Sequence, residues 1–335
     1  MTGSYLAGVD IGGTKIAVSL ANTSGISIRV YQNTRLEGTS TIIPEQVDFL
    51  LRYACEQRGV QPDTIMAVGV SSCGPFVKEM NRTLLVAPNL CGGLVPDRGI
   101  IPNDWTRIPL EAVLSRRWST LTIENDAVAA AVAERLFGAG GGEDDLVYVT
   151  WSTGIGSGAY INGMLIHGKN GNAPHIGHMY LAEDGPRCGC GNFGDMESLV
   201  SGLAIARDYG GGLTAEDVFK ACQNGDGKAK EIISKAIRNF ARGLASINAI
   251  LDTKVIVIGG SVFINNSEML LPGIRDEFYR SFPVLSEGVD IRPSGLGSYL
   301  GDMAALSLVM PDDWIRKWQD NELWERAPPA IMLDR

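Results

Sequence analysis

The sequence LAGVDIGGTKIAVSLA at residues 6–21 predicts two apolar strands joined by a glycine-rich turn at residues 12–14. Because glycine has no Cβ, the backbone N–H groups of this turn can approach a phosphate, and Thr14 and Lys15 can add a hydroxyl and a cation. Asp10 precedes the turn, where its carboxylate could hold Mg²⁺ through water. An ordinary tight hairpin uses the same residue types, so the turn alone leaves both interpretations open.

The rest of the chain alternates between predicted strands and helices. Short apolar runs predict strands at 65–71, 121–124 and 255–258. Helical patterns predict helices at 44–58, 127–137, 197–208, 215–224, 229–251 and from 301. Residues 146–163 repeat the opening order of strand, glycine-rich turn and strand, which suggests an internal duplication. This alternation predicts an α/β fold with mixed sheets.

Length and composition limit the class of protein. With 335 residues the chain exceeds what a single core usually supports, which favours two lobes. Its 45% hydrophobic and 20% charged residues exclude a disordered chain, and a net charge of −9 without a basic patch disfavours nucleic-acid binding. The sequence has no long apolar run, no secretion signal and no disulfide-like cysteine pattern, so we expect a cytoplasmic protein without membrane contact.

All three histidines of the chain fall within residues 167–178. His178 is followed at short spacing by Cys188 and Cys190. Imidazole and thiolate are the ligands that zinc prefers, so these three residues form the beginning of a closed zinc site.

Several motifs occur in the order found in ROK-family sugar kinases, and together they cover roughly residues 5–310. They are DIGGTK (10–15), IENDAVAAAVAERLFG (123–138), STGIGSGAYINGMLIHG (152–168), IGHMYL (176–181) and CGCGNFGDMESLVSG (188–202). The chain therefore resembles this family. The resemblance implies the two-lobed, actin-like ATPase fold of the ribonuclease H type, in which ATP and a hexose meet in an interdomain cleft.

The resemblance also implies where the two lobes begin and end. Residues 1–120 would form the small lobe with loops that line the sugar, completed by the C-terminal helix at about 301–335. Residues 121–300 would form the large lobe with the catalytic aspartate, the zinc loop and the adenosine side.

For the sugar, the resemblance implies that Asp126 is the general base that accepts a proton from the attacking hydroxyl. A carboxylate at the start of a helix is also a common N-cap, and Asp126 could serve as both. Glu197 would contact the anomeric end of the sugar, although it could equally be an ordinary first-turn acid. The implied sugar-binding residues are Gly74, Asn89, Asn125, Asp126, His175, His178 and Glu197.

For the nucleotide, the resemblance implies two phosphate loops and one adenosine loop. The loop at 152–156 would approach the β- and γ-phosphates as the first turn does. A Gly-Gly pair after a strand is often only a turn, but its order in the chain fits the adenosine side. The implied ATP-binding residues are Asp10, Gly12, Gly13, Thr14, Lys15, Thr153, Gly154, Gly259 and Gly260.

The chain departs from the family at the predicted zinc site. The family carries a cysteine where this chain has Asp195. A carboxylate can bind zinc but is a harder donor than a thiolate, so a site of His178, Cys188, Cys190 and Asp195 should hold structural zinc more weakly. The alternative is a metal-free turn held by hydrogen bonds.

A second departure lies at His175, where the family usually has a glutamate that accepts hydrogen bonds from sugar hydroxyls. A neutral imidazole offers one donor and one acceptor, so the pairing of the pocket with its sugar should change. We therefore expect an unusual sugar, with a 2-acetamido or amino sugar favoured. An impaired pocket is the alternative.

The predicted activity is ATP-dependent phosphorylation of a hexose or N-acetylhexosamine at the 6-hydroxyl, with ATP, Mg²⁺ and structural Zn²⁺. The alternatives are a non-catalytic protein that binds sugar and ATP, or a kinase of an unusual amino sugar. The expected partner is a small-molecule sugar, in a homodimer or homotetramer.

Overall fold

The structure is a computed structural model that describes residues 4–95 and 101–334. It contains two compact units. Unit 1 comprises residues 1–137, 167–172 and 296–335, and unit 2 comprises residues 138–166 and 173–295. These ranges differ from the expected lobes chiefly at residues 121–137, which pack in unit 1 because they pair with its sheet and contact its helices.

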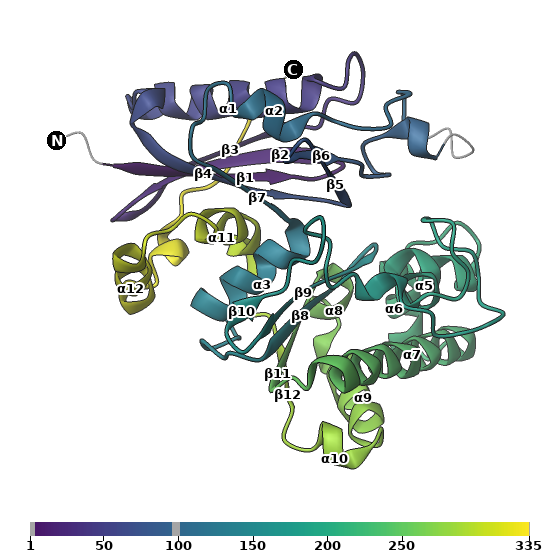
Figure 1. The fold of residues 1–335 in the computed structure, drawn as a ribbon. Coiled ribbons are helices and arrows are strands. Elements are labelled where there is room, and N and C mark those ends of the chain that lie inside the picture. Colours follow the sequence, from purple (N-terminus) through teal and green to yellow (C-terminus); the bar gives the residue numbers. More distant parts are fainter. Residues whose placement is uncertain (1–3, 96–100, 335) are drawn as a thin grey trace. The chain divides into compact units, whose positions relative to one another are not determined.

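Unit 1 is built on a six-stranded sheet in the order β13-β3-β2-β1-β4-β7 (Figure 1). Its sheet strands are β1 (Tyr5–Ile11), β2 (Lys15–Asn22), β3 (Gly25–Asn33), β4 (Ile65–Ser72), β7 (Leu121–Asn125) and β13 (Ile331–Met332), and a separate hairpin is formed by β5 (Phe76–Glu79) and β6 (Arg82–Leu85). Its α-helices are α1 (Ile42–Arg58), α2 (Leu110–Leu114), α3 (Asp126–Phe137), α11 (Leu300–Ser307) and α12 (Asp312–Asn321).

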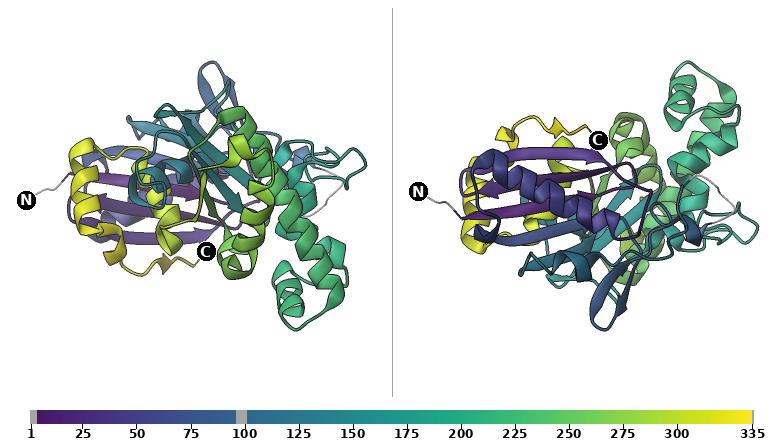
Figure 2. Two further views of the ribbon diagram at one scale, coloured as in Figure 1. Left: turned by 90° about the horizontal axis from the view of Figure 1, so that it is seen from below. Right: turned by 90° about the horizontal axis from the view of Figure 1, so that it is seen from above.

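Helices cover both faces of this sheet. Helix α1 crosses one face, and α11 packs on the other beside α3 (Figure 2). The close approach of α11 requires a glycine in β4, because a Cβ on Gly69 would lie 2.0 Å from the Ala305 carbonyl oxygen. Alternation along β1 buries Val9 and Ile11 in the core, while Asp10 is only partly buried.

Unit 2 is built on a five-stranded sheet in the order β10-β9-β8-β11-β12. Its strands are β8 (Leu146–Trp151), β9 (Ile155–Ile161), β10 (Met164–Leu165), β11 (Val255–Gly259) and β12 (Asp290–Pro293). Its α-helices are α4 (Met196–Val200), α5 (Gly202–Tyr209), α6 (Ala215–Gln223), α7 (Gly227–Leu251), α8 (Ser261–Ile264), α9 (Ser267–Tyr279) and α10 (Pro283–Ser286). In its core the indole of Trp151 stacks on Phe240 with ring centroids 4.1 Å apart.

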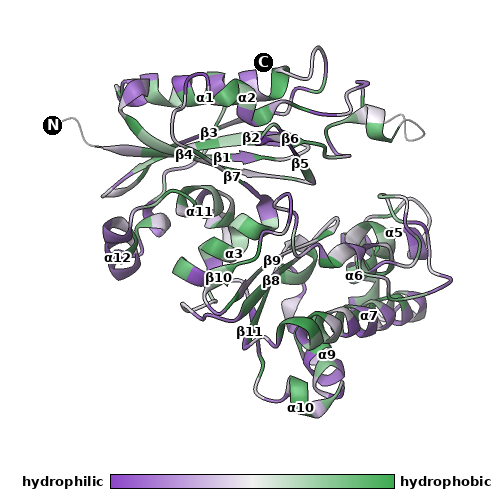
Figure 3. Ribbon diagram, viewed as in Figure 1, coloured by the Kyte–Doolittle hydropathy of each residue, from purple (hydrophilic) through white to green (hydrophobic). Residues whose placement is uncertain are grey.

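The C-terminal segment packs against its own unit. Helix α12 is largely hydrophilic (Figure 3), but its two tryptophans, Trp314 and Trp318, are buried. Trp324 is also buried and meets Phe137 edge to face at 5.4 Å between ring centroids. Among the described residues, no helix is both long enough and apolar enough to cross a membrane.

Candidate functional site

The carboxyl ends of three neighbouring strands bring the predicted residues of unit 1 together. Strands β1, β4 and β7 are parallel, with Asp10 opposite Ser71 and Ser72 opposite Asn125. In parallel sheets the carboxyl ends lie at one edge, which is where α/β proteins commonly bind ligands. Asp10, the loop after β4 and the start of α3 therefore share one edge of the unit 1 sheet.

The glycine-rich turn at residues 12–15 is held by the neighbouring strand end. Thr34 donates from its backbone N–H to the Thr14 carbonyl at 2.9 Å and from its hydroxyl to the Gly12 carbonyl at 2.8 Å. A Cβ on Gly13 would lie 3.4 Å from the Cβ of Asn89. The structure thus brings Asn89 against the predicted phosphate turn.

Asp126 is the first residue of α3. The Ala127 N–H donates to the Asp126 carboxylate at 2.8 Å and to Asn125 Oδ1 at 3.1 Å. The side chain remains accessible to solvent. Desolvation by the surrounding protein atoms raises the pKa of Asp126 to about 6. Hydrogen bonds from Ala127 and Asn125 lower the pKa, but desolvation outweighs them. At neutral pH this group is an accessible carboxylate that can still accept a proton.

Asp10 lies close to two other carboxyl groups. Burial is the largest cause that raises the pKa of Asp10 to about 7, and repulsion from Asp126 and Asp302 adds to it. Lys15 opposes this shift. A cation at this point would relieve the repulsion, so the donor chemistry fits a bound metal ion.

The second glycine-rich turn joins β8 to β9 in unit 2. Gly202 donates from its N–H to the Ser152 carbonyl at 2.8 Å, and the Ile155 N–H donates to Glu197 Oε2 at 2.9 Å. A Cβ on Gly154 would lie 2.6 Å from the same carboxylate oxygen, so a larger residue there would require the Glu197 side chain to shift. Glu197 therefore holds this turn, and its contact with a sugar stays a prediction.

A pocket of about 730 Å³ opens beside this turn within unit 2. Such a volume is in the range of small-molecule sites. Its lining includes Thr153 of the turn and Ser261, and the hydroxyls of Ser152 and Ser261 lie 2.8 Å apart. Helix α6 supplies Phe219 and Lys220 to the same wall.

Gly259 and Gly260 have a packing role beside this pocket. A Cβ on Gly259 would lie 2.5 Å from the Tyr148 hydroxyl, and one on Gly260 would lie 2.4 Å from the Trp151 carbonyl oxygen. Gly260 also has φ +87°, a conformation that favours glycine. The pair lets the chain turn sharply, so that Ser261 lines the pocket.

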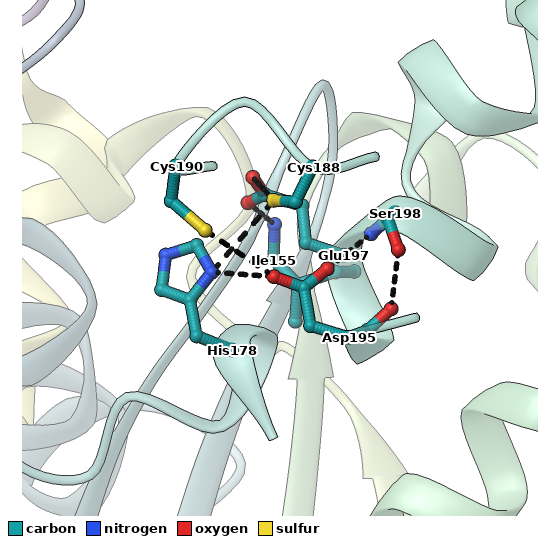
Figure 4. A network of polar contacts seen from close by, with 7 residues as sticks. All are labelled: Ile155, His178, Cys188, Cys190, Asp195, Glu197 and Ser198. Atoms are coloured by element: carbon teal, nitrogen blue, oxygen red, sulfur yellow. Dashed lines mark hydrogen bonds and ion pairs between the residues drawn. The ribbon is translucent and has the colours of Figure 1, made fainter. Parts of the chain in front are cut away.

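The four predicted metal ligands converge in unit 2 (Figure 4). One ligand atom from each of His178, Cys188, Cys190 and Asp195 lies within 4.8 Å of the others. His178 Nδ1 is 3.0 Å from Asp195 Oδ2 and 3.9 Å from Cys188 Sγ, and Cys190 Sγ is 3.4 Å from Asp195 Oδ2. Tetrahedral zinc with bonds of about 2.0–2.3 Å separates its ligands by roughly 3.3–3.8 Å, so the cluster fits zinc.

Asp195 has two separate tasks. Its Oδ1 caps α4 by accepting the Ser198 N–H at 2.8 Å, while Oδ2 faces His178 and Cys190. The side chain is completely buried. Burial would raise its pKa, but hydrogen bonds from His178, Cys188 and Ser198 outweigh burial and lower the pKa below the usual range. The carboxylate is therefore ionised and available to a cation.

His175 is exposed, and its ring centroid is 5.0 Å from that of His178. The loop that carries it is anchored through Ser157, whose hydroxyl bonds the Pro174 carbonyl and accepts the Ile176 N–H at 3.3 Å. The imidazole at position 175 is thus held at the surface next to the metal cluster.

The model of the ROK family matches residues 6–309 of the chain. The chain belongs to the ROK family. Among its ROK relatives are a glucokinase of Aeropyrum pernix, 31% identical over 91% of this chain and 97% of the relative, and an N-acetylmannosamine kinase of Escherichia fergusonii, 34% identical over 76% and 82%. The structure of a ROK glucokinase from Streptomyces griseus, in complex with glucose and AMPPNP, matches with a TM-score of 0.70 and 29% identity over 91% of this chain and 99% of that one.

These matches confirm the predicted fold class, which is the α/β, actin-like ATPase fold of the ROK sugar kinases. In unit 1, Asp10, Asn125 and Asp126 lie at one edge of the sheet, and in unit 2 the four predicted metal ligands converge. Sequence reasoning missed two contributors to the described surfaces. Helix α6 lines the unit 2 pocket, and Asn172 contacts the loop after β4. Neither carries a motif, because the α6 pattern is that of any amphipathic helix and Asn172 is a single amide in a loop.

Proposed function

We propose that this ROK protein transfers the γ-phosphoryl group of ATP to the 6-hydroxyl of a hexose or N-acetylhexosamine, with Asp126 as general base. Membership of the family and relatives named glucokinase and N-acetylmannosamine kinase support sugar phosphorylation. The observation that carries the role of Asp126 is its accessible carboxylate, at the sheet edge that also bears Asp10 and the glycine-rich turn.

In this mechanism the sugar hydroxyl gives its proton to the Asp126 carboxylate as its oxygen attacks the γ-phosphorus. The proton acceptor must be ionised beforehand, and a pKa of about 6 allows that at neutral pH. Asn125 lies next to the base and would bond ring hydroxyls. Gly74 and Asn89 would line the sugar from the neighbouring loops.

The two glycine-rich turns would bind the phosphates through backbone N–H groups. In unit 1 these are the amides at Gly12, Gly13 and Thr14, with the Lys15 ammonium nearby. In unit 2 they are the amides at Thr153 and Gly154. The adenosine would bind in the pocket bordered by Ser261, the residue that follows Gly259 and Gly260. Asp10 would hold Mg²⁺, which when bound neutralises phosphate charge.

Structural zinc would be held by His178, Cys188, Cys190 and Asp195. A bound metal would keep the loop that carries His178 and the start of α4 in one arrangement. With a carboxylate in place of a thiolate, we expect a weaker site than one with three cysteines.

The sugar would be a 2-acetamido or amino sugar. The exposed His175 imidazole, when neutral, offers one hydrogen-bond donor and one acceptor, whereas the family glutamate only accepts. The rival proposal is a protein that binds sugar and ATP without turnover, to which the same two departures point. We also propose a cytoplasmic homodimer or homotetramer.

The test is ADP release with Mg²⁺ and ATP across glucose, mannose, glucosamine, N-acetylglucosamine and N-acetylmannosamine. We expect turnover with at least one sugar, a rate that declines below about pH 6, and a loss of at least 10²-fold in kcat in Asp126→Asn. Asp63→Asn, at an exposed surface position, is the matched control and should keep full activity. A folded protein that binds sugar and ATP but releases no ADP would favour the non-catalytic rival.

A further inference from the structure

Residues 167–172 form a short segment that packs in unit 1, although the residues before and after it in the chain belong to unit 2. It ends in Asn172, directly after Gly171. Gly171 has φ +83°, which favours glycine, and a Cβ there would be 4.0 Å from the ring of Phe76. The segment therefore turns at Gly171 and presents Asn172 to the start of β5.

The Asn172 amide pairs with both backbone groups of Phe76. The Phe76 N–H donates to Asn172 Oδ1 at 2.7 Å, and Asn172 Nδ2 donates to the Phe76 carbonyl at 2.8 Å. Phe76 also lies opposite Leu85 in the β5–β6 hairpin, and the Asn172 side chain satisfies the Phe76 N–H and carbonyl as a further strand would. Phe76 itself is anchored, since its ring is buried in the unit 1 core.

This pairing lies beside two residues that we assign to the sugar. A Cβ on Gly74 would lie 3.0 Å from Asn125 Nδ2 and 3.9 Å from Asn172 Oδ1. Gly74 is therefore packed between the two amides, and Asn125 is itself 94% buried at the end of β7, immediately before Asp126. A shift of the loop at Gly74 would change the space around Asn125 directly.

The same segment makes a second contact at its other end. His167 Nε2 lies 2.9 Å from Glu124 Oε1, and Glu124 precedes Asn125 in β7. His167 is about half exposed, whereas the Glu124 side chain is mostly buried. The segment is thus attached both to the loop that carries Gly74 and to the strand that carries Asn125.

We propose that Asn172 is a positioning residue for the sugar: its amide holds the Phe76 backbone, and through it Gly74, at a set separation from Asn125. The inference rests on the proposed function, because it assigns Gly74 and Asn125 to sugar hydroxyls. It adds a residue that acts through the Phe76 backbone and Gly74, so we expect its effect on sugar affinity. Loss of this amide leaves two backbone groups without their partner and lets the loop move.

The test compares wild type with Asn172→Ala and Asn172→Asp. Alanine removes both hydrogen bonds, whereas aspartate keeps the acceptor for the Phe76 N–H and repels the Phe76 carbonyl oxygen. We expect the sugar KM, measured with the best substrate of the panel above, to rise about tenfold or more in Asn172→Ala, while the ATP KM stays within about twofold. Hydrogen exchange at the Phe76 amide should accelerate in Asn172→Ala and less in Asn172→Asp.

Asn22→Ala is the matched control, because the Asn22 side-chain oxygen also accepts a backbone N–H, that of Ser24, in the β2–β3 hairpin of unit 1. It should change neither KM. Faster exchange at Phe76 with an unchanged sugar KM would overturn the proposal, and so would equal changes in both KM values. If wild type binds sugar without turnover, calorimetric Kd values replace KM and the proposal is tested while the kinase assignment fails. A wild type that binds no sugar of the panel overturns both.

Discussion

At the scale of single residues, burial raises the pKa of two carboxyl groups of unit 1, Asp10 and Asp126. Asp10 in β1 is repelled by Asp126 and Asp302, whereas Lys15 and a hydrogen bond from Ser71 favour its ionised form. Its pKa of about 7 lies above the value of 3.8 expected in an unfolded chain. Strongly shifted carboxyl groups often lie in functional sites, which agrees with the proposal that Asp10 holds Mg²⁺.

This shift predicts how Asp10→Asn changes stability with pH. A raised pKa means that the folded state binds the proton more tightly, so stability falls as pH rises from about 4 to 7 while Asp10 ionises. Asparagine cannot ionise, so we expect Asp10→Asn to raise Tm at pH 8 and to leave it nearly unchanged at pH 4. Thermal melts at both pH values check this, with Asp63→Asn as control. An equal Tm change at both pH values would contradict it.

At the scale of elements, the loop from His178 to α4 depends on Asp195 twice. One carboxylate oxygen caps the helix and the other faces the predicted metal ligands, while Glu197, two residues later, holds the Ile155 amide. Cys188 Sγ also lies 3.6 Å from Glu197 Oε1, so the metal cluster and the second glycine-rich turn share a neighbour (Figure 4). Order in this loop should therefore extend to the turn.

The two tasks of Asp195 can be separated by Asp195→Asn. The amide oxygen can still accept the Ser198 N–H, but the anionic ligand is lost, so the helix cap should survive while zinc is released. We expect about one zinc per wild-type chain by elemental analysis and well below half of that in the variant. Asp184→Asn, exposed in the preceding loop, should retain zinc. A wild type purified without chelator that contains no zinc would rule out the metal assignment.

At the scale of the whole molecule, the chain extends beyond the part that matches the ROK family. Residues after 309 form α12, a short turn of helix and β13, which pairs in parallel with β3 at Ile331 opposite Val30. Trp318 is fully buried, and its indole N–H donates to the Asn22 carbonyl at 3.2 Å. This extension covers apolar surface of unit 1 that would otherwise face water.

Trp318→Ala should therefore destabilise unit 1 by about 3–5 kcal/mol, the cost of a large cavity in a core. Urea denaturation followed by circular dichroism measures this as an earlier transition. Lys317→Ala, an exposed neighbour in the same helix, controls for helix propensity and should shift the midpoint little. Equal midpoints for the two variants would show that the extension adds no stability.

Most local helices and strands could be predicted from the sequence, but the contacts between segments far apart in the chain could not. The β1–turn–β2 hairpin, β4 and α7 appear near their predicted positions, because periodicity and turn residues act over a few neighbours. Strands β3 and β12 and helix α9 were not predicted, since Gly25–Asn33 mixes polar with apolar residues and α9 contains Pro272. Strand β13 has only two residues and exists because the edge of β3 is there to pair with it.

The sequence by itself determined the chemistry available to this protein: two glycine-rich turns, a carboxylate at a strand-to-helix junction, and four metal-ligand side chains at close spacing. Only the tertiary structure decided how these groups are held. It brought Asp10 within electrostatic range of Asp126, set Glu197 against the second turn, and brought Asn172 to Phe76 across 96 positions of the chain. Residue types and spacings are local properties, whereas these contacts follow from the pairing of strands and the packing of loops that are far apart in sequence.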